Sequence, residues 1–136
     1  MGREEEGVDR IRKFLETYPD VWNAWFLLGW GLRRLRRFAE ARDAFERALE
    51  TGPRQTDTLN ELAICTMELG ELATAQSLLT EALSMEPENT KIISNLGILA
   101  LKLDNLQDAE GYFRAVLELT PDDQVAQTYL EQLADA

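Results

Sequence analysis

The side chains that catalysis most often uses are scarce in this sequence. It contains no histidine, the commonest general base and metal ligand. The single cysteine, Cys65, has no histidine to activate it, and we interpret it as a small packed hydrophobe. Asp122 with Asp123, and Asp104 with Asp108, stand at expected turns and helix starts, where carboxylates cap backbone N–H groups. We therefore predict no catalytic residue, no metal site and no cofactor, so the protein is not expected to be an enzyme.

A basic cluster at residues 33–37, Arg-Arg-Leu-Arg-Arg, is the second group that could do chemistry. We favour its interpretation as a solvated helix end, whose cations complement the negative C-terminus of a helix. In the alternative, Arg33 and Arg34 face a binding groove and contact a phosphate or an acidic motif. The residue types leave both interpretations open.

The formal net charge of −11 is distributed unevenly along the chain. Residues 1–55 carry 11 basic and 10 acidic side chains, whereas residues 56–136 carry 3 and 15. Phosphate would be repelled from most of this surface, which argues against nucleic acid as the main ligand. The same asymmetry would orient a charged protein partner and raise its association rate at low salt.

Length and composition favour one domain with a continuous core, since 45% of the 136 residues are hydrophobic and 29% are charged. The longest uncharged stretch, residues 21–32, is too short to span a bilayer, and we expect no membrane contact. A single cysteine cannot form an internal disulfide. This is consistent with a reducing compartment, and we expect the protein to be cytoplasmic.

Large and small apolar residues recur with a period of 34 residues. When Trp22, Thr56 and Thr90 are taken as first positions, three successive segments match in residue type. The matches are Trp25, Leu59 and Ile93 at the fourth position; Leu28, Leu62 and Leu96 at the seventh; Gly29, Ala63 and Gly97 at the eighth; Ala41, Ala75 and Ala109 at the twentieth; Phe45, Leu79 and Phe113 at the twenty-fourth; Ala48, Ala82 and Val116 at the twenty-seventh; and Pro53, Pro87 and Pro121 at the thirty-second.

Each 34-residue segment is predicted to form two antiparallel helices. Apolar residues recur at three- and four-residue steps before and after a break at residues 36–37, which indicates one apolar stripe on each helix. Small residues such as Gly29 and Ala41 let the two helices approach closely enough to bury both stripes. At the turn between the helices, Gly70 suits a left-handed backbone, whereas Arg36 would adopt it at a cost of roughly 1 kcal/mol.

This pattern resembles the tetratricopeptide repeat family. The resemblance implies an all-α fold, a right-handed superhelical solenoid of antiparallel helix hairpins, in one domain over residues 1–136. The first helix of each repeat would line the concave face. The expected divisions are a half-repeat with only its second helix at 1–21, full repeats at 22–55, 56–89 and 90–123, and a C-terminal capping helix at 124–136.

By the same resemblance, the second, fifth, ninth, twelfth and thirteenth positions of a repeat point into a groove. Five of the six residues at the ninth and twelfth positions are apolar, although none is expected in the core of a hairpin. The groove therefore suits an apolar peptide or an amphipathic helix, unless the chain's own termini or a symmetry partner in a homodimer fill it. The candidate residues are Phe26, Trp30, Arg33, Arg34, Asn60, Ile64, Met67, Lys91, Asn95, Ile98 and Leu101.

Family members that bind the acidic C-terminal tails of chaperones use a clamp of lysine, asparagine and arginine. At the five clamp positions this chain carries Phe26, Trp30, Glu61, Lys91 and Asn95. Lys91 alone matches, and Glu61 would repel a carboxylate. We therefore do not expect chaperone tails among the partners.

The leading hypothesis is a protein-interaction scaffold that holds one segment of a partner protein in this groove. The alternatives are an architectural or self-associating segment of a longer repeat array, and an accessory domain of a multidomain enzyme. Ile11, Phe14 and Pro19 fall at the second-helix core and proline positions of a preceding repeat. Either the chain is a fragment of a longer array, which we favour, or the array starts with a lone helix.

Overall fold

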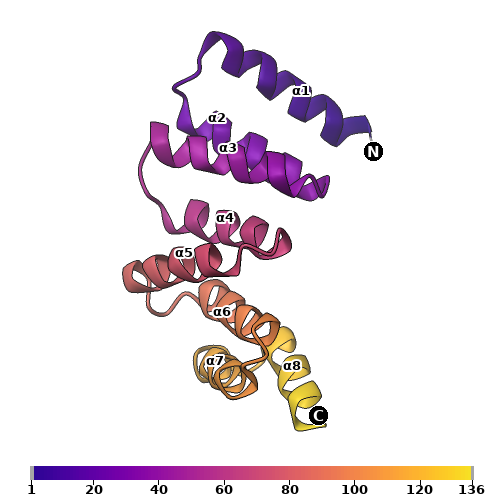
Figure 1. Ribbon diagram of the computed structural model, residues 1–136, viewed down its shortest axis with the longest axis vertical. Coiled ribbons are helices and arrows are strands. Elements are labelled where there is room, and N and C mark those ends of the chain that lie inside the picture. Colours follow the sequence, from indigo (N-terminus) through magenta and orange to yellow (C-terminus); the bar gives the residue numbers. More distant parts are fainter. Residues whose placement is uncertain (1, 136) are drawn as a thin grey trace. The chain divides into compact units, whose positions relative to one another are not determined.

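The computed structural model describes residues 2–135, and over this range it contains eight α-helices and no β-strand (Figure 1). The all-α repeat of helical hairpins predicted from the sequence is confirmed. Three helices begin at the first positions of the three full repeats. The outermost residues of the expected domain, 1 and 136, lie outside the described part. The helices are α1 (Gly2–Thr17), α2 (Trp22–Arg34), α3 (Phe38–Thr51), α4 (Thr56–Glu68), α5 (Leu72–Met85), α6 (Thr90–Lys102), α7 (Leu106–Leu119) and α8 (Gln124–Ala134).

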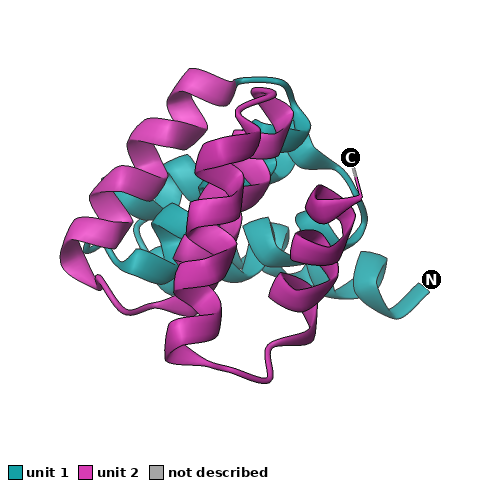
Figure 2. Cartoon of the chain, turned by 90° about the horizontal axis from the view of Figure 1, so that it is seen from below, with its two compact units in different colours: residues 1–71 teal, residues 72–136 magenta. Residues whose placement is uncertain are grey.

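The helices group into two compact units, residues 1–71 with α1 to α4 and residues 72–136 with α5 to α8 (Figure 2). In the first unit, α2 packs against α1 and α3, and α3 also packs against α4. In the second unit, α6 packs against α5 and α7, and α7 also packs against α8. Each unit thus buries apolar stripes between helices that are neighbours in the sequence.

Two hairpins depend on a glycine that lies against a phenylalanine ring. A Cβ atom added to Gly29 would lie 2.8 Å from Cδ1 of Phe45, and one added to Gly97 would lie 2.7 Å from Cζ of Phe113. Both rings are fully buried. The eighth position must therefore be a glycine wherever the twenty-fourth position is a phenylalanine, since a methyl group does not fit between helix and ring.

The turns that follow α2, α4 and α6 share one geometry. Arg36, Gly70 and Asp104 occupy equivalent positions and adopt left-handed backbones with φ of 61°, 79° and 59°. The residue after each donates its N–H to a carbonyl five residues earlier, which is the bond of a Schellman motif. These bonds join Arg37 to Leu32 at 2.9 Å, Glu71 to Thr66 at 2.8 Å and Asn105 to Ala100 at 2.8 Å. Arg36 thus adopts the turn geometry of Gly70 despite its side chain.

Of the aspartates that were predicted to cap helices, Asp123 does so and Asp104 does not. Asp123 caps α8 as predicted, because its Oδ1 accepts a hydrogen bond from Ala126 N at 2.9 Å. The cap of α7 is Asn105 rather than either neighbouring aspartate, and its Oδ1 accepts from Asp108 N at 3.3 Å. Asp104 serves as the left-handed turn residue instead.

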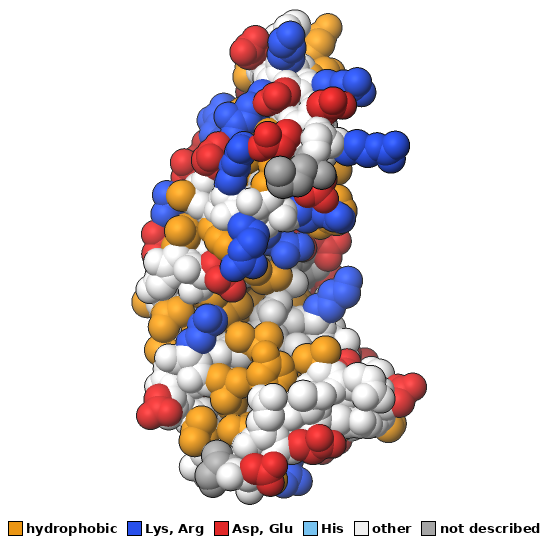
Figure 3. Space-filling model, turned by 90° about the vertical axis from the view of Figure 1, so that its right-hand side faces the viewer, with side chains coloured by type: hydrophobic (Ala, Val, Ile, Leu, Met, Phe, Trp, Pro, Cys, Tyr) orange, Lys and Arg blue, Asp and Glu red, His pale blue; other side chains and the backbone are white. Residues whose placement is uncertain are grey.

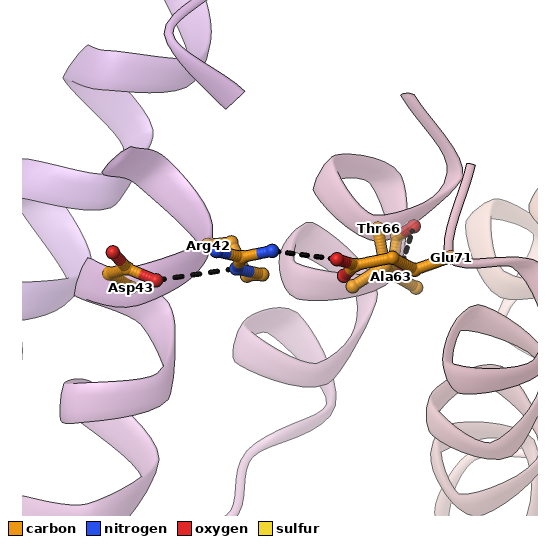
Figure 4. Close-up of polar contacts among 5 residues, drawn as sticks. All are labelled: Arg42, Asp43, Ala63, Thr66 and Glu71. Atoms are coloured by element: carbon orange, nitrogen blue, oxygen red, sulfur yellow. Dashed lines mark hydrogen bonds and ion pairs between the residues drawn. The ribbon is translucent and has the colours of Figure 1, made fainter. Parts of the chain in front are cut away.

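A polar bridge ties α3 to the turn after α4 (Figure 4). Arg42 Nη1 lies 2.7 Å from Glu71 Oε2, and Arg42 Nε lies 3.3 Å from Asp43 Oδ1. On α4 itself, the hydroxyl of Thr66 donates to Ala63 O at 2.9 Å. The bridge thus links α3 to the turn that follows α4.

The contact between Gly29 and Phe45 can be tested by a double-mutant cycle. We expect Gly29→Ala to lower the free energy of unfolding by about 2 kcal/mol, because the methyl group overpacks the ring. In a Phe45→Leu background the same change should cost much less, since the second repeat already combines Ala63 with Leu79 at these positions. Urea unfolding followed by circular dichroism would measure both effects.

The control is Gly111→Ala, whose added Cβ meets no atom within 4 Å. It should raise the stability by about 1 kcal/mol through helix propensity alone. Equal costs of Gly29→Ala in the two backgrounds would contradict the interpretation.

Candidate functional site

The candidate groove residues fall in both units, and each set is considered by itself. Seven lie on α2 and α4 of the first unit, two helices that contact each other directly. Four lie on α6 of the second unit: Lys91, Asn95, Ile98 and Leu101. In the first unit Trp30 and Arg34 are exposed, Phe26, Arg33, Asn60 and Ile64 are half-buried, and Met67 is buried.

Trp30 is the exposed aromatic residue of this set, with 40% of its surface accessible. The guanidinium carbon of Arg34 lies 4.8 Å from the centre of the Trp30 ring. Arg34 is itself held by Glu4 of α1, at 2.9 Å between Nη2 and Oε1. The cation–π contact and the ion pair together hold the Arg34 guanidinium against the ring.

Arg33 and Glu61 form an ion pair between α2 and α4. Arg33 Nε lies 2.6 Å from Glu61 Oε2, and both side chains are mostly buried. In the sequence, Arg33 was a candidate for binding an anion and Glu61 a carboxylate that would repel one. The structure joins the two, and each neutralises the other.

The remaining arginines of the cluster at residues 33–37 also have partners on nearby side chains. Arg37 pairs with Glu5 of α1, and the guanidinium of Arg36 lies 5.2 Å from the centre of the Phe38 ring. Neither interpretation drawn from the sequence included these carboxylates. The carboxylates that pair with the arginines lie on α1 and α4, far from residues 33–37 in the sequence. No local pattern in the residues indicates this pairing.

Four candidate groove residues contribute to the core, contrary to expectation. Phe26 packs edge-on against the buried Phe45, with ring centres 5.6 Å apart. Met67 is buried. Ile98 and Leu101 pack against the apolar cluster of the second unit. The buried apolar stripe of the first helices α2 and α6 thus extends to positions that the sequence assigned to the groove, and at Phe26 the contact lies within its own hairpin.

In the second unit, the same apolar cluster includes side chains of α8. Tyr129, Leu130 and Leu133 pack against it, and the Tyr129 ring stacks on Phe113 with centres 4.6 Å apart. Lys91 stays exposed and Asn95 is half-buried. Figure 3 shows apolar side chains gathered over the C-terminal helices on one face, and basic side chains over the N-terminal helices.

One apolar surface of the first unit was not among the candidate residues. It is a cleft of about 360 Å³ between α1 and α2, which we call the α1–α2 cleft. The sequence did contain a signal, since Ile11 and Phe14 stand at core positions of an incomplete repeat. The lining consists of Ile11, Phe14, Val21, Ala24 and Leu27, with Arg10 and Asn23 as the polar members.

Cys65 is fully buried on α4. Burial, assisted by the nearby charge of Glu61, raises the pKa of its thiol from 9.0 to about 12. A thiol of this kind stays protonated at neutral pH and is a poor nucleophile.

Among the described residues no group of three or more histidine, cysteine, aspartate or glutamate side chains could hold a metal ion. In the same part of the chain, no helix combines the length and apolar character that crossing a membrane requires.

The chain resembles known proteins along most of its length. Residues 10–127 match the family model described as "Cytochrome c-type biogenesis protein H TPR domain". No curated protein matches the sequence.

Solved structures share the fold at low sequence identity. "MamA RS-1 ArsTM double mutant" has a TM-score of 0.89 and 14% identity, and covers 98% of this chain and 75% of its own. "YrrB: a TPR protein with an unusual peptide-binding site" has a TM-score of 0.78 and 21% identity, and covers 98% and 78%. "First TPR of Spaghetti (RPAP3) bound to HSP90 peptide SRMEEVD" has a TM-score of 0.73 and 23% identity, and covers 79% and 85%.

The buried thiol gives a pH-dependent stability that can be measured. The raised pKa keeps the folded thiol protonated up to about pH 12, whereas the unfolded thiol ionises near pH 9.0. Ionisation of the thiol therefore does not affect the free energy of unfolding below pH 9.0. As the pH rises from 9.0 toward 12, ionisation favours the unfolded chain, and the free energy of unfolding falls by at most about 1.4 kcal/mol per pH unit. Urea unfolding at several alkaline pH values should show this loss in the wild type and a smaller one in Cys65→Ala. Parallel pH profiles for the two proteins would contradict the assignment.

Proposed function

This chain belongs to the family of the cytochrome c-type biogenesis protein H TPR domain, and on this premise we propose that it is a protein-interaction scaffold. Its proposed ligand is an apolar or amphipathic segment of a partner protein. The proposed contact surface in the first unit is the face of α2 and α4 that carries Trp30, Asn60 and Ile64, which we call the Trp30 face. The half-exposed ring of Trp30, supported by Arg34, is the observation that carries the proposal.

Structures of similar fold support this class of function. Two of them are described by a bound peptide or a peptide-binding site, which is a statement about those proteins. For this chain the fold supports an interaction scaffold in general. A role in binding rather than catalysis also agrees with a sequence that lacks histidine and whose one thiol is buried.

The charges on the Trp30 face favour an uncharged ligand segment. Arg33 is paired with Glu61 and Arg34 with Glu4, so neither arginine is free to bind a ligand carboxylate without giving up a partner. Burial of the exposed part of an indole, about 100 Å², contributes about 2.5 kcal/mol. Because association itself costs at least several kcal/mol, we propose micromolar affinity that depends strongly on Trp30.

Trp30→Ala tests the proposal directly. A library of random peptides displayed on phage should yield peptides rich in apolar residues with the wild type, and these should lose most of their binding to Trp30→Ala. The variant should melt at a lower temperature but remain folded at room temperature, because it loses the buried part of the ring and one cation–π contact while 40% of the residue is already exposed. Leu106→Ala, on an exposed side chain of α7, is the matched control and should bind as the wild type does.

Two results would count against the Trp30 face. If the selected peptides bind Trp30→Ala and the wild type equally, the ligand lies elsewhere. If Trp30→Ala unfolds the chain, Trp30 is a core residue.

A second prediction concerns chaperone tails. The peptide SRMEEVD should show no saturable binding by fluorescence polarisation at concentrations that saturate a clamp-bearing TPR domain. The physical reason is that Phe26 and Trp30 replace two clamp residues, and Glu61 places a paired carboxylate at a third. Saturable binding that is lost in Lys91→Ala would contradict this prediction, since Lys91 is the one residue that matches the clamp.

A further inference from the structure

The ion pair between Arg33 and Glu61 lies beside Trp30. Arg33 stands three residues after Trp30 on α2, so the two side chains emerge on the same side of the helix. Glu61 stands on α4 next to Asn60 and three residues before Ile64. The pair therefore adjoins the residues that define the Trp30 face, and it links the two helices that form this face.

Both oxygens of the Glu61 carboxylate lie near the guanidinium of Arg33. Nε of Arg33 lies 2.6 Å from Oε2 of Glu61, and Nη2 of Arg33 lies 3.5 Å from Oε1. An arginine that binds the carboxylate of a ligand uses the same guanidinium nitrogens. Glu61 thus stands where a ligand carboxylate would pair with Arg33.

This pair is more deeply buried than the neighbouring pair of Arg34 with Glu4. Side-chain exposure is 27% for Arg33 and 17% for Glu61, against 49% for Arg34 and 38% for Glu4. Water and salt screen exposed charges strongly and partly buried charges less. If its partner were removed, the charge of Arg33 or Glu61 would therefore act on a neighbouring ligand more strongly than the charge of Arg34 would.

We propose that the Arg33–Glu61 pair determines the charge specificity of the Trp30 face, so that the partner segment carries uncharged residues next to the apolar side chain that contacts Trp30. This inference rests on the proposed function, because it concerns the same surface. In the wild type, a ligand carboxylate beside Arg33 also lies beside Glu61, and a ligand cation beside Glu61 also lies beside Arg33. Attraction and repulsion offset each other in both cases, whereas the charged ligand residue still loses part of its hydration.

Each member of the pair is a charge-binding group that its partner neutralises. In Glu61→Gln, the guanidinium of Arg33 keeps its charge and loses its carboxylate, so an acidic ligand residue should take the place of Glu61. In Arg33→Gln, the carboxylate of Glu61 remains, and a basic ligand residue should be favoured instead. Asp57 and Glu68 are also exposed on α4, but they are common to all these proteins and do not contribute to the differences.

The test selects a library of random peptides displayed on phage against the full chain as wild type, Glu61→Gln and Arg33→Gln. Peptides from Glu61→Gln should be enriched in aspartate and glutamate, and peptides from Arg33→Gln in lysine and arginine. In fluorescence anisotropy, synthetic peptides from each variant should bind that variant at least about tenfold more tightly than they bind the wild type. The double variant with both substitutions carries neither charge and should lose both preferences.

The two single variants test the proposal separately, so circular dichroism first establishes that each is folded. If one of them unfolds, the other still has to show its expected charge preference. Failure of both to fold would overturn the proposal, because the pair would then serve the fold rather than specificity. Peptides from the folded single variants with the same charge as those from the wild type would overturn it as well.

Glu4→Gln is the matched control, because it removes the carboxylate partner of Arg34, whose guanidinium lies against the Trp30 ring. Its peptides should gain fewer acidic residues than those from Glu61→Gln, and equal enrichment would overturn the assignment to the Arg33–Glu61 pair. Trp30→Ala distinguishes this inference from the proposed function. Peptides that bind Trp30→Ala and the wild type equally would count against the Trp30 face itself, whereas Trp30-dependent binding without the charge preferences would overturn the charge specificity alone.

Discussion

In the first and third full repeats, the close contact between a glycine of one helix and a phenylalanine ring of the next is the constraint on which the hairpin depends. Phe45 and Phe113 are fully buried because Gly29 and Gly97 present bare backbone to them. This contact sets how the two helices of a hairpin face each other. It therefore also sets which side chains of the first helix turn outward, and Trp30, one residue after Gly29, is one of them.

Ion pairs between helices decide which charges remain for a ligand. The carboxylates of α1 and α4 neutralise most of the basic cluster at residues 33–37. A run of arginines that suggests anion binding in the sequence therefore becomes a set of links between neighbouring helices. Among the described residues of the first unit, the cations that form no ion pair are Arg3, Arg10 and Lys13 on α1 and Arg36 in the turn after α2. The α1–α2 cleft thus includes the unpaired Arg10 among its apolar side chains. On the Trp30 face, by contrast, Arg33 and Arg34 are both paired with carboxylates.

The first unit consequently presents two surfaces of different chemistry. On the proposed Trp30 face, the main exposed apolar group is a single indole that contacts the guanidinium of Arg34. The α1–α2 cleft is lined by five apolar side chains, with Arg10 and Asn23 as its polar members. The two surfaces share α2 but use different second helices, α4 for the Trp30 face and α1 for the cleft.

The pattern of residues was sufficient to predict the repeat, the hairpins, the left-handed turn at Gly70 and the buried thiol, whereas Arg36 adopts the same turn at a position where its side chain disfavours it. These features depend on the size and backbone preference of residues a few positions apart. The same residue types recur every 34 residues, which makes the pattern easy to recognise. The packed helices were needed to show that Met67, Ile98 and Leu101 join cores, that Arg33 is neutralised by Glu61, and that Phe14 and Leu27 are exposed. The physical reason is that packing between hairpins and ion pairs between helices join residues far apart in the sequence. Their geometry follows from how the helices stack, which no local spacing specifies.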